Sequence, residues 1–189
     1  MLKKIVVRGL GGLAVVIALL LLVGSFQATD YKVERSISIN AAPATVWPWV
    51  SQLKKAQEWS PWDDEDPSIK IEYSGVDGTV GAGSAWDSEK AGAGNQHITA
   101  LDTNKRVDLH LQFLKPFKDE AEAGFVITPE ASGSRVTWSM NGHWNLVAKV
   151  AGLFMNMDKM MGGEFEKGLR ELKLKAEADQ AKAAAAPAP

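Results

Sequence analysis

The sequence predicts an α+β fold in which a curved, seven-stranded antiparallel sheet wraps on one long C-terminal helix. Three observations predict this fold. Seven segments have the composition and alternation of strands and are joined by short turns. Two short helical segments follow the first strand, and an apolar stripe of helical period runs through the C-terminal part. With 189 residues, the chain is long enough for one domain of ordinary size with short additions.

The first strand is predicted over Tyr31–Ile39, where apolar residues alternate with polar ones and therefore share one face. Pro43 suits the first turn of a helix, so a short helix is expected over 44–53 and a second over 54–59. Pro48 complicates the first helix, because a proline disfavours helical geometry in the residue before it. This helix therefore either begins at Pro48 or is kinked there.

Six further strand candidates continue the chain, separated by turns rich in glycine, proline and aspartate. They are Ile69–Ser74, Ser84–Ser88, Gln96–Leu101, Arg106–Leu114, Ala121–Thr128 and Ser134–Trp144. Because the connections are short, neighbouring strands should run antiparallel. One face of such a sheet must be covered, and only the C-terminal helix is large enough to cover it.

The long helix is expected to start near Leu146 and to run for about 30 residues, with apolar side chains at spacings of three and four. Gly162 and Gly163 interrupt it, and two glycines destabilise a helix by roughly 2 kcal/mol relative to alanine. They indicate either a kink or a place where another group comes close to the backbone. Residues 176–189 are rich in alanine and are predicted to form a disordered tail.

The start of the chain has the pattern of a membrane anchor. Residues 5–24 are apolar or glycine apart from Arg8, and a helix of this length spans the roughly 30 Å hydrocarbon core of a bilayer. Lys3, Lys4 and Arg8 place Met1 in the cytoplasm by the positive-inside rule. The prediction is a single-pass protein of the inner (cytoplasmic) membrane, with its soluble domain on the periplasmic or extracellular side.

Two other interpretations of this segment remain open. A secretory signal peptide also has a basic start and an apolar centre, and cleavage after Ser25 would release a secreted protein. A buried core helix is the third possibility. With an anchor, the chain divides into a membrane helix at 1–28, a folded domain at 29–175 and the tail at 176–189.

Composition excludes several classes of function. The chain contains no cysteine, so disulfides, thiolate metal sites and a cysteine nucleophile are excluded. Its formal net charge is −2, and a mildly acidic protein lacks the basic footprint of nucleic-acid binding.

His97, His110 and His143 have no metal-ligand spacing on a helix, and His110 should pair with Asp108 on the polar face of its strand. The cluster Asp63–Asp66 lacks the glycine and spacing of a calcium loop, so it is interpreted as a solvated turn. No metal and no cofactor are expected.

A curved sheet wrapped on one helix leaves a space between them, and large, soft side chains are predicted to surround it. The segment Trp59–Trp62 closes one end, either as an aromatic gate over the cavity or as a hydrophobic plug that fixes the short helices on the sheet. The methionines of the long helix are either core residues or adaptable ligand contacts, and those off its apolar stripe are candidates for an exposed patch. The predicted ligand-binding residues are Trp59, Trp62, Trp86, Leu111, Phe113, Phe125, Trp138, Met140, Phe154, Met157 and Met161.

Five segments of the chain carry a family resemblance. They are Tyr31–Pro43 (YKVERSISINAAP), Trp59–Trp62 (WSPW), Gly81–Trp86 (GAGSAW), Arg135–Trp138 (RVTW) and Phe165–Lys173 (FEKGLRELK). With the order of the elements, they resemble the SRPBCC superfamily, the helix-grip fold of START-like and birch-pollen-allergen-like proteins. The most similar subgroup is the bacterial membrane-anchored set described as polyketide cyclase/dehydrase-like. The resemblance covers roughly residues 30–175 and implies a cavity for lipids, sterols or polyketides. It transfers no catalytic residue, because no catalytic motif of such enzymes is matched.

Three hypotheses of function follow. The first is a non-enzymatic, membrane-anchored binding domain for an apolar small molecule or lipid. The second is a cyclase or dehydratase acting on an apolar carbonyl compound, which needs a titratable group in the cavity. Strand parity places Arg35, alone among the charged residues, on an inner face. The third is an envelope interaction module with a filled core. A cavity of at least ~300 Å³ would count against this third hypothesis.

Overall fold

The computed structural model describes residues 12, 15, 18–62, 66, 68–90, 92–116, 118–144, 146–153 and 157–185. The side chains of residues 147, 151 and 157 are not among those described. The chain forms two compact units. One contains residues 1–31 and 143–157, and the other contains residues 32–142 and 158–189.

The elements follow the predicted order. Strand β1 (Asp30–Ile39) is followed by the short helices α2 (Pro43–Ser51) and α3 (Leu53–Gln57). The next six strands are β2 (Lys70–Ser74), β3 (Gly83–Ser88), β4 (Gly92–Asp102), β5 (Arg106–Lys115), β6 (Asp119–Glu130) and β7 (Gly133–His143). The last two helices are α5 (Leu146–Gly152) and α6 (Met157–Ala185).

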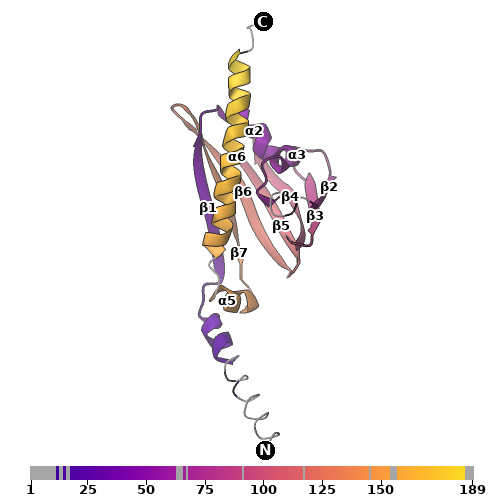
Figure 1. Cartoon of the computed structure of the whole chain (residues 1–189), viewed down its shortest axis with the longest axis vertical. Coiled ribbons are helices and arrows are strands. Elements are labelled where there is room, and N and C mark those ends of the chain that lie inside the picture. The colour runs from indigo at the N-terminus through magenta and orange to yellow at the C-terminus, as the bar shows by residue number, and fades with distance from the viewer. Residues whose placement is uncertain are drawn as a thin grey trace, which may run out of the picture. The chain divides into compact units, whose positions relative to one another are not determined.

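The seven strands form one sheet in the order β1-β7-β6-β5-β4-β3-β2. Each strand from β2 to β6 pairs antiparallel with the next one along the chain. Figure 1 shows α6 running across one face of this curved sheet, with α2 and α3 beside the C-terminal half of α6. The predicted antiparallel sheet, two short helices and long C-terminal helix are therefore confirmed.

Helix α2 does not begin at Pro48, which was one of the two interpretations of that proline. Its first residue is Pro43, and Pro48 lies inside it. Pro43 is tolerated there because the first backbone N–H of a helix needs no partner within the helix. The helix start has no capping side chain of its own. Instead, Gln180 of α6 accepts hydrogen bonds through Oε1 from the backbone N–H of Ala42 (3.0 Å) and the hydroxyl of Thr45 (2.9 Å).

The single long helix expected from Leu146 is two helices, because α5 ends at Gly152 and α6 begins at Met157. Gly162 and Gly163 lie within α6 and do not interrupt it. At Gly162 the close-approach interpretation is correct, because a Cβ atom there would overlap the guanidinium group of Arg35 on β1. At Gly163 a Cβ atom would meet no described atom within 4 Å.

Helix α6 also continues past residue 175, into the segment that was expected to be a disordered tail. Alanine, lysine and glutamate favour helix, and tertiary contacts hold this part of it. Ala176 is fully buried, Glu177 accepts a 2.8 Å hydrogen bond from the backbone N–H of Asn40, and Asp179 accepts one from the Trp49 indole (3.2 Å). Residues 186–189 lie outside the described residues.

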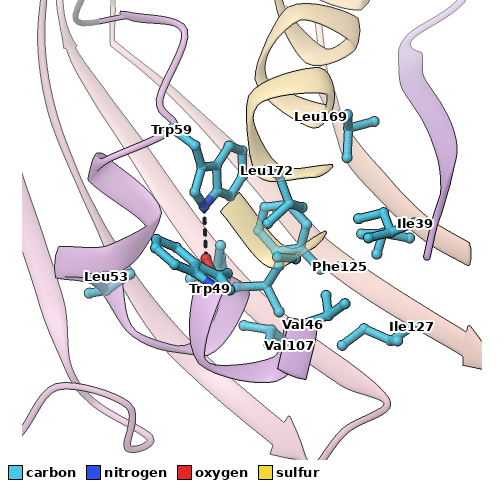
Figure 2. Close-up of a cluster of buried hydrophobic side chains, with 14 of the residues drawn as sticks. Ile39, Val46, Trp49, Leu53, Trp59, Val107, Phe125, Ile127, Leu169 and Leu172 are labelled. Atoms are coloured by element: carbon cyan, nitrogen blue, oxygen red, sulfur yellow. Dashed lines mark hydrogen bonds between the residues drawn. The ribbon is translucent and has the colours of Figure 1, made fainter. Parts of the chain in front are cut away.

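The hydrophobic core lies between the second half of α6, α2 and the sheet. Leu169 and Leu172 of α6 are at most 1% exposed and pack with residues of β1, α2, β5, β6 and β7. Figure 2 shows Trp59 at one side of this cluster, with its indole N–H donating a 2.8 Å hydrogen bond to the Trp49 carbonyl. The core therefore fills the part of the covered face that lies against the second half of α6.

The other unit joins the end of the N-terminal segment to the chain that follows β7. Residues 18–25 are helical. The Trp144 backbone N–H donates to the Thr29 carbonyl (2.6 Å), and the Tyr31 ring meets the Trp144 ring edge-on at 5.1 Å. Much of the predicted membrane segment 5–24 lies outside the described residues. Within the described part of the chain, no helix is long and apolar enough to span a bilayer.

Candidate functional site

A cavity of about 410 Å³ lies between the sheet and the first turns of α6. Side chains from α2, α3, the segment after α3, strands β2 to β7 and α6 form its wall. Nine of the predicted ligand-binding residues line it: Trp59, Trp62, Trp86, Leu111, Phe113, Phe125, Trp138, Met140 and Met161. Of the other two, Phe154 lies outside the described residues, and the side chain of Met157 is not described.

The space exists because small residues occupy inward-facing positions of the sheet. Ala123 of β6 stands opposite Leu109 of β5 and Met140 of β7, and its methyl group fills little of the gap between them. Gly94 of β4 has no side chain, and the Trp86 indole lies so close that a Cβ atom at Gly94 would overlap it. The missing side chain therefore allows Trp86 to lie over β4 at the cavity wall.

Aromatic rings form two groups around the cavity. In the inner group Trp59 and Phe165 are buried and Trp138 is partly buried: Trp138 stacks on Phe165 of α6 (4.0 Å, 5° between planes), and Trp59 meets Trp138 edge-on at 5.4 Å. The outer pair is Trp86 and Phe113, whose ring centres are 6.1 Å apart. Both rings of the outer pair are partly exposed.

The two ends of the segment Trp59–Trp62 differ. Trp59 is 3% exposed, and its indole N–H is bound to the Trp49 carbonyl, so this end is the hydrophobic plug. Gly168 of α6 fits against it, because a Cβ atom there would lie 3.1 Å from Pro61 and 3.3 Å from the Trp59 ring. Trp62 is partly exposed and lines the cavity. This is the position expected of a gate residue.

Five polar residues of the cavity wall were not predicted as site residues: Gln57, Ser60, Ser84, Gln96 and Glu164. Ser84 of β3 and Gln96 of β4 line it, and the Gln96 amide donates to the Ser84 hydroxyl (3.1 Å). Glu164 lines it from α6. The signal for Glu164 was its spacing: it lies three residues after Met161, and residues three apart are neighbours on one side of a helix. Met160, which the apolar stripe left out, also lines the cavity and is 51% exposed.

Arg35 faces inward on β1 as parity predicted, but it is not among the cavity-lining residues. Its two Nη atoms each donate a 3.0 Å hydrogen bond to one carboxylate oxygen of Asp158, and its Nε donates to Glu166 (2.9 Å). The hydrogen bonds from Arg35 hold the pKa of Asp158 below its usual value. Arg35 therefore fastens the start of α6 to β1.

In the acidic turn, residues 63–65 lie outside the described residues, but Asp66 is 5% exposed and forms local hydrogen bonds. It accepts hydrogen bonds from the Ser68 hydroxyl (2.6 Å), the Ser88 hydroxyl (2.5 Å) and the Ser68 backbone N–H (3.0 Å). These bonds, that of the Ser68 hydroxyl first, lower the pKa of Asp66 to about 2. Among the described residues, no group of three histidine, aspartate or glutamate side chains is arranged to hold a metal ion.

The expected pair of His110 with Asp108 is not formed. His110 Nδ1 lies 2.8 Å from Oε1 of Glu122, which stands directly opposite it on β6. Residues opposite each other on neighbouring strands are closer than residues two apart on one strand. Asp108 instead accepts a 2.7 Å hydrogen bond from Arg106.

Solved structures of known proteins share this fold at low sequence identity. Protein CV1439 from Chromobacterium violaceum has 12% identity and a TM-score of 0.59, with 77% of this chain and 96% of that chain covered. Protein MLL2253 from Mesorhizobium loti has 16% identity and a TM-score of 0.57, with coverage of 78% and 98%. The di-domain ARO/CYC protein StfQ from the steffimycin biosynthetic pathway has 10% identity and a TM-score of 0.58, with 80% and 52% covered. These likenesses concern the fold.

No curated protein matches this chain in sequence. Residues 30–177 match the model of the family described as polyketide cyclase / dehydrase and lipid transport. The matched region begins at β1 and ends within α6, so it contains the sheet, both short helices and every residue of the cavity wall named above. With the helix-grip architecture, this match assigns the chain to the polyketide cyclase / dehydrase and lipid transport family, within the SRPBCC superfamily.

Proposed function

We propose that this protein is a membrane-anchored, non-enzymatic binding domain that holds an apolar small molecule or lipid between the sheet and α6. The observation that carries the proposal is the cavity of about 410 Å³, a volume within the ~300–1,000 Å³ of typical small-molecule sites. Its lining is mainly aromatic and aliphatic. Burial of apolar ligand surface there contributes about 25 cal/mol per Å², and a few polar side chains orient the ligand.

The anchor part of the proposal rests on the sequence of residues 5–24 and the basic residues before them. A domain tethered to a bilayer exchanges apolar molecules with that bilayer over a short distance. We place the domain on the periplasmic or extracellular side of the inner membrane. Membrane fractionation tests the anchor, and the intact mass of the protein shows whether the chain has been cut after Ser25, which would give the secreted form.

Native mass spectrometry of the full-length chain, extracted from its own membrane under mild conditions, tests ligand binding. We expect a reproducible additional mass that disappears on denaturation. Ala123→Phe, and the milder Ala123→Leu, fill the cavity and should remove this mass. Ala85→Phe is the matched control, because Ala85 is exposed on β3 and does not line the cavity. An additional mass that persists in both folded Ala123 variants would contradict binding in the cavity.

One observation favours a second candidate, an enzyme of the cyclase or dehydratase type. Glu164 is a carboxyl group at the wall of an apolar cavity, which is the kind of titratable group that such chemistry requires. The molecule recovered by mass spectrometry decides between the two. Conversion of the recovered molecule by the wild-type chain, lost in Glu164→Gln while binding is kept, would favour the enzyme. Recovery of the same unaltered molecule from both proteins would favour a binding domain.

A further inference from the structure

The charge of the cavity wall carries an inference about the ligand. Among the lining side chains that the structure describes, Glu164 is the only charged one. The other polar side chains of the wall, such as Ser84 and Gln96, can both donate and accept hydrogen bonds. They therefore do not select the sign of a ligand's charge, whereas an ionised carboxylate does.

The carboxylate of Glu164 is also incompletely paired. Its Oε2 atom is buried and has no hydrogen-bond partner among the residues that the structure describes. A buried acceptor without a donor destabilises the protein, because it has lost water and gained nothing in exchange. A donor group brought by a ligand into the cavity would reduce that penalty.

The aromatic lining favours the same kind of ligand. Four indole rings, those of Trp59, Trp62, Trp86 and Trp138, line the cavity. The faces of indole rings attract cations, and desolvated sites strengthen that attraction. The wall thus combines one acidic side chain with four indole rings.

We infer that the ligand is an apolar molecule whose polar end is a hydrogen-bond donor, an ammonium or a hydroxyl group, which the Glu164 carboxylate receives. Ligands that end in a carboxylate or a phosphate are repelled by the same group. This inference rests on the proposed function, since it names the class of molecule that the cavity takes.

Three molecules with the same decyl chain test the inference: decylamine, 1-decanol and decanoate. Each competes with the neutral fluorescent probe N-phenyl-1-naphthylamine for the full-length chain held in an amphipathic polymer. We expect decylamine to bind about tenfold more tightly than decanoate, the scale of one charge-assisted hydrogen bond, with 1-decanol between them. Polymer without protein, and the Ala123→Phe and Ala123→Leu variants, measure uptake outside the cavity.

The substitution Glu164→Gln keeps the shape of the side chain and removes its charge. It should weaken decylamine binding by about tenfold and strengthen decanoate binding. Glu171→Gln is the control, because Glu171 is exposed on α6 and does not line the cavity, yet its loss changes the net charge equally. Glu171→Gln should leave the order of the three molecules unchanged.

The outcomes separate the two proposals. Equal binding of all three molecules, abolished by both folded Ala123 variants, would overturn the inference and leave the binding function intact. The same conclusion follows if Glu164→Gln and Glu171→Gln act alike. Binding that the Ala123 variants do not change would overturn the proposed function itself.

Discussion

The neighbouring glycines of α6 allow a test of the contact between α6 and β1. Both lie inside the helix, where replacing glycine by alanine is worth about 0.8–1.0 kcal/mol of helix propensity. At Gly163 a Cβ atom would meet no described atom within 4 Å. Gly163→Ala should therefore raise the free energy of unfolding by about 1 kcal/mol and the Tm by about 2–4 °C.

Gly162→Ala should not show this gain. Its Cβ atom would overlap the Arg35 guanidinium, which must then leave its bidentate position on Asp158. The propensity gain is the same as at Gly163, but it is opposed by the loss of charge-assisted hydrogen bonds. We therefore expect the Tm of Gly162→Ala to lie below that of Gly163→Ala.

Thermal unfolding of the full-length chain, followed by near-ultraviolet circular dichroism of the tryptophans, measures both variants. The same two substitutions in an Arg35→Ala background complete a double-mutant cycle. Without the guanidinium, Gly162→Ala and Gly163→Ala should stabilise the protein equally. The reasoning is refuted if the two variants are equal in the presence of Arg35, or if their difference survives its removal.

Three further predictions concern residues that hold the fold together. The pKa of Asp66 is about 2 in the folded protein against about 3.9 unfolded, so its stabilising effect is complete above pH ~5 and is lost as the pH falls through 2. In urea denaturation, Asp66→Asn should lose this pH dependence and have a lower free energy of unfolding at neutral pH than the wild type. Trp59→Phe leaves the buried Trp49 carbonyl without its donor and should lower the free energy of unfolding by roughly 1–3 kcal/mol in chemical denaturation; unchanged stability would contradict the plug assignment. Gln180→Ala removes the acceptor at the start of α2 and should lower the free energy of unfolding by about 1 kcal/mol, measured by calorimetry. If residues 176–189 were a solvated tail, the substitution would have no effect.

Alternation of apolar and polar residues predicted all seven strands, because a half-buried strand has a side-chain period of two. The largest error was at the start of β4, which begins at Gly92 rather than at residue 96. Glycines there indicated a turn, but Gly94 lies in the strand because the Trp86 indole needs the space above it. A requirement set by a tertiary contact is not visible in the local pattern.

The C-terminal part shows the same limit. The apolar stripe continues through α5 and α6, so periodicity alone does not separate the two helices, although a glycine such as Gly152 is a common helix end. The alanine-rich segment after residue 175 has the composition of a solvated tail. Its helix is held by Gln180 and its neighbours, whose partners on α2 and on the turn before it are more than a hundred residues away in sequence.

Nine residues of the cavity wall followed from parity and helical spacing, because large apolar side chains face the covered side of the sheet. Glu164 was missed because a single acidic residue beside an apolar stripe usually lies in solvent. Arg35 was placed on the correct face but in the wrong surroundings. Strand parity gives the direction of a side chain. It does not show whether the facing helix carries partner residues, as α6 does for Arg35 with Asp158 and Glu166.

The sheet order places the first strand beside the last, and this arrangement constrains when the domain can form during synthesis. β1 ends at Ile39, while β7, its neighbour, begins at Gly133. At the ~5–20 residues per second of translation, β1 emerges on the order of ten seconds before its partner. During that interval its edge is unpaired, so a nascent chain halted before β7 should be a preferred client of chaperones that bind extended apolar segments.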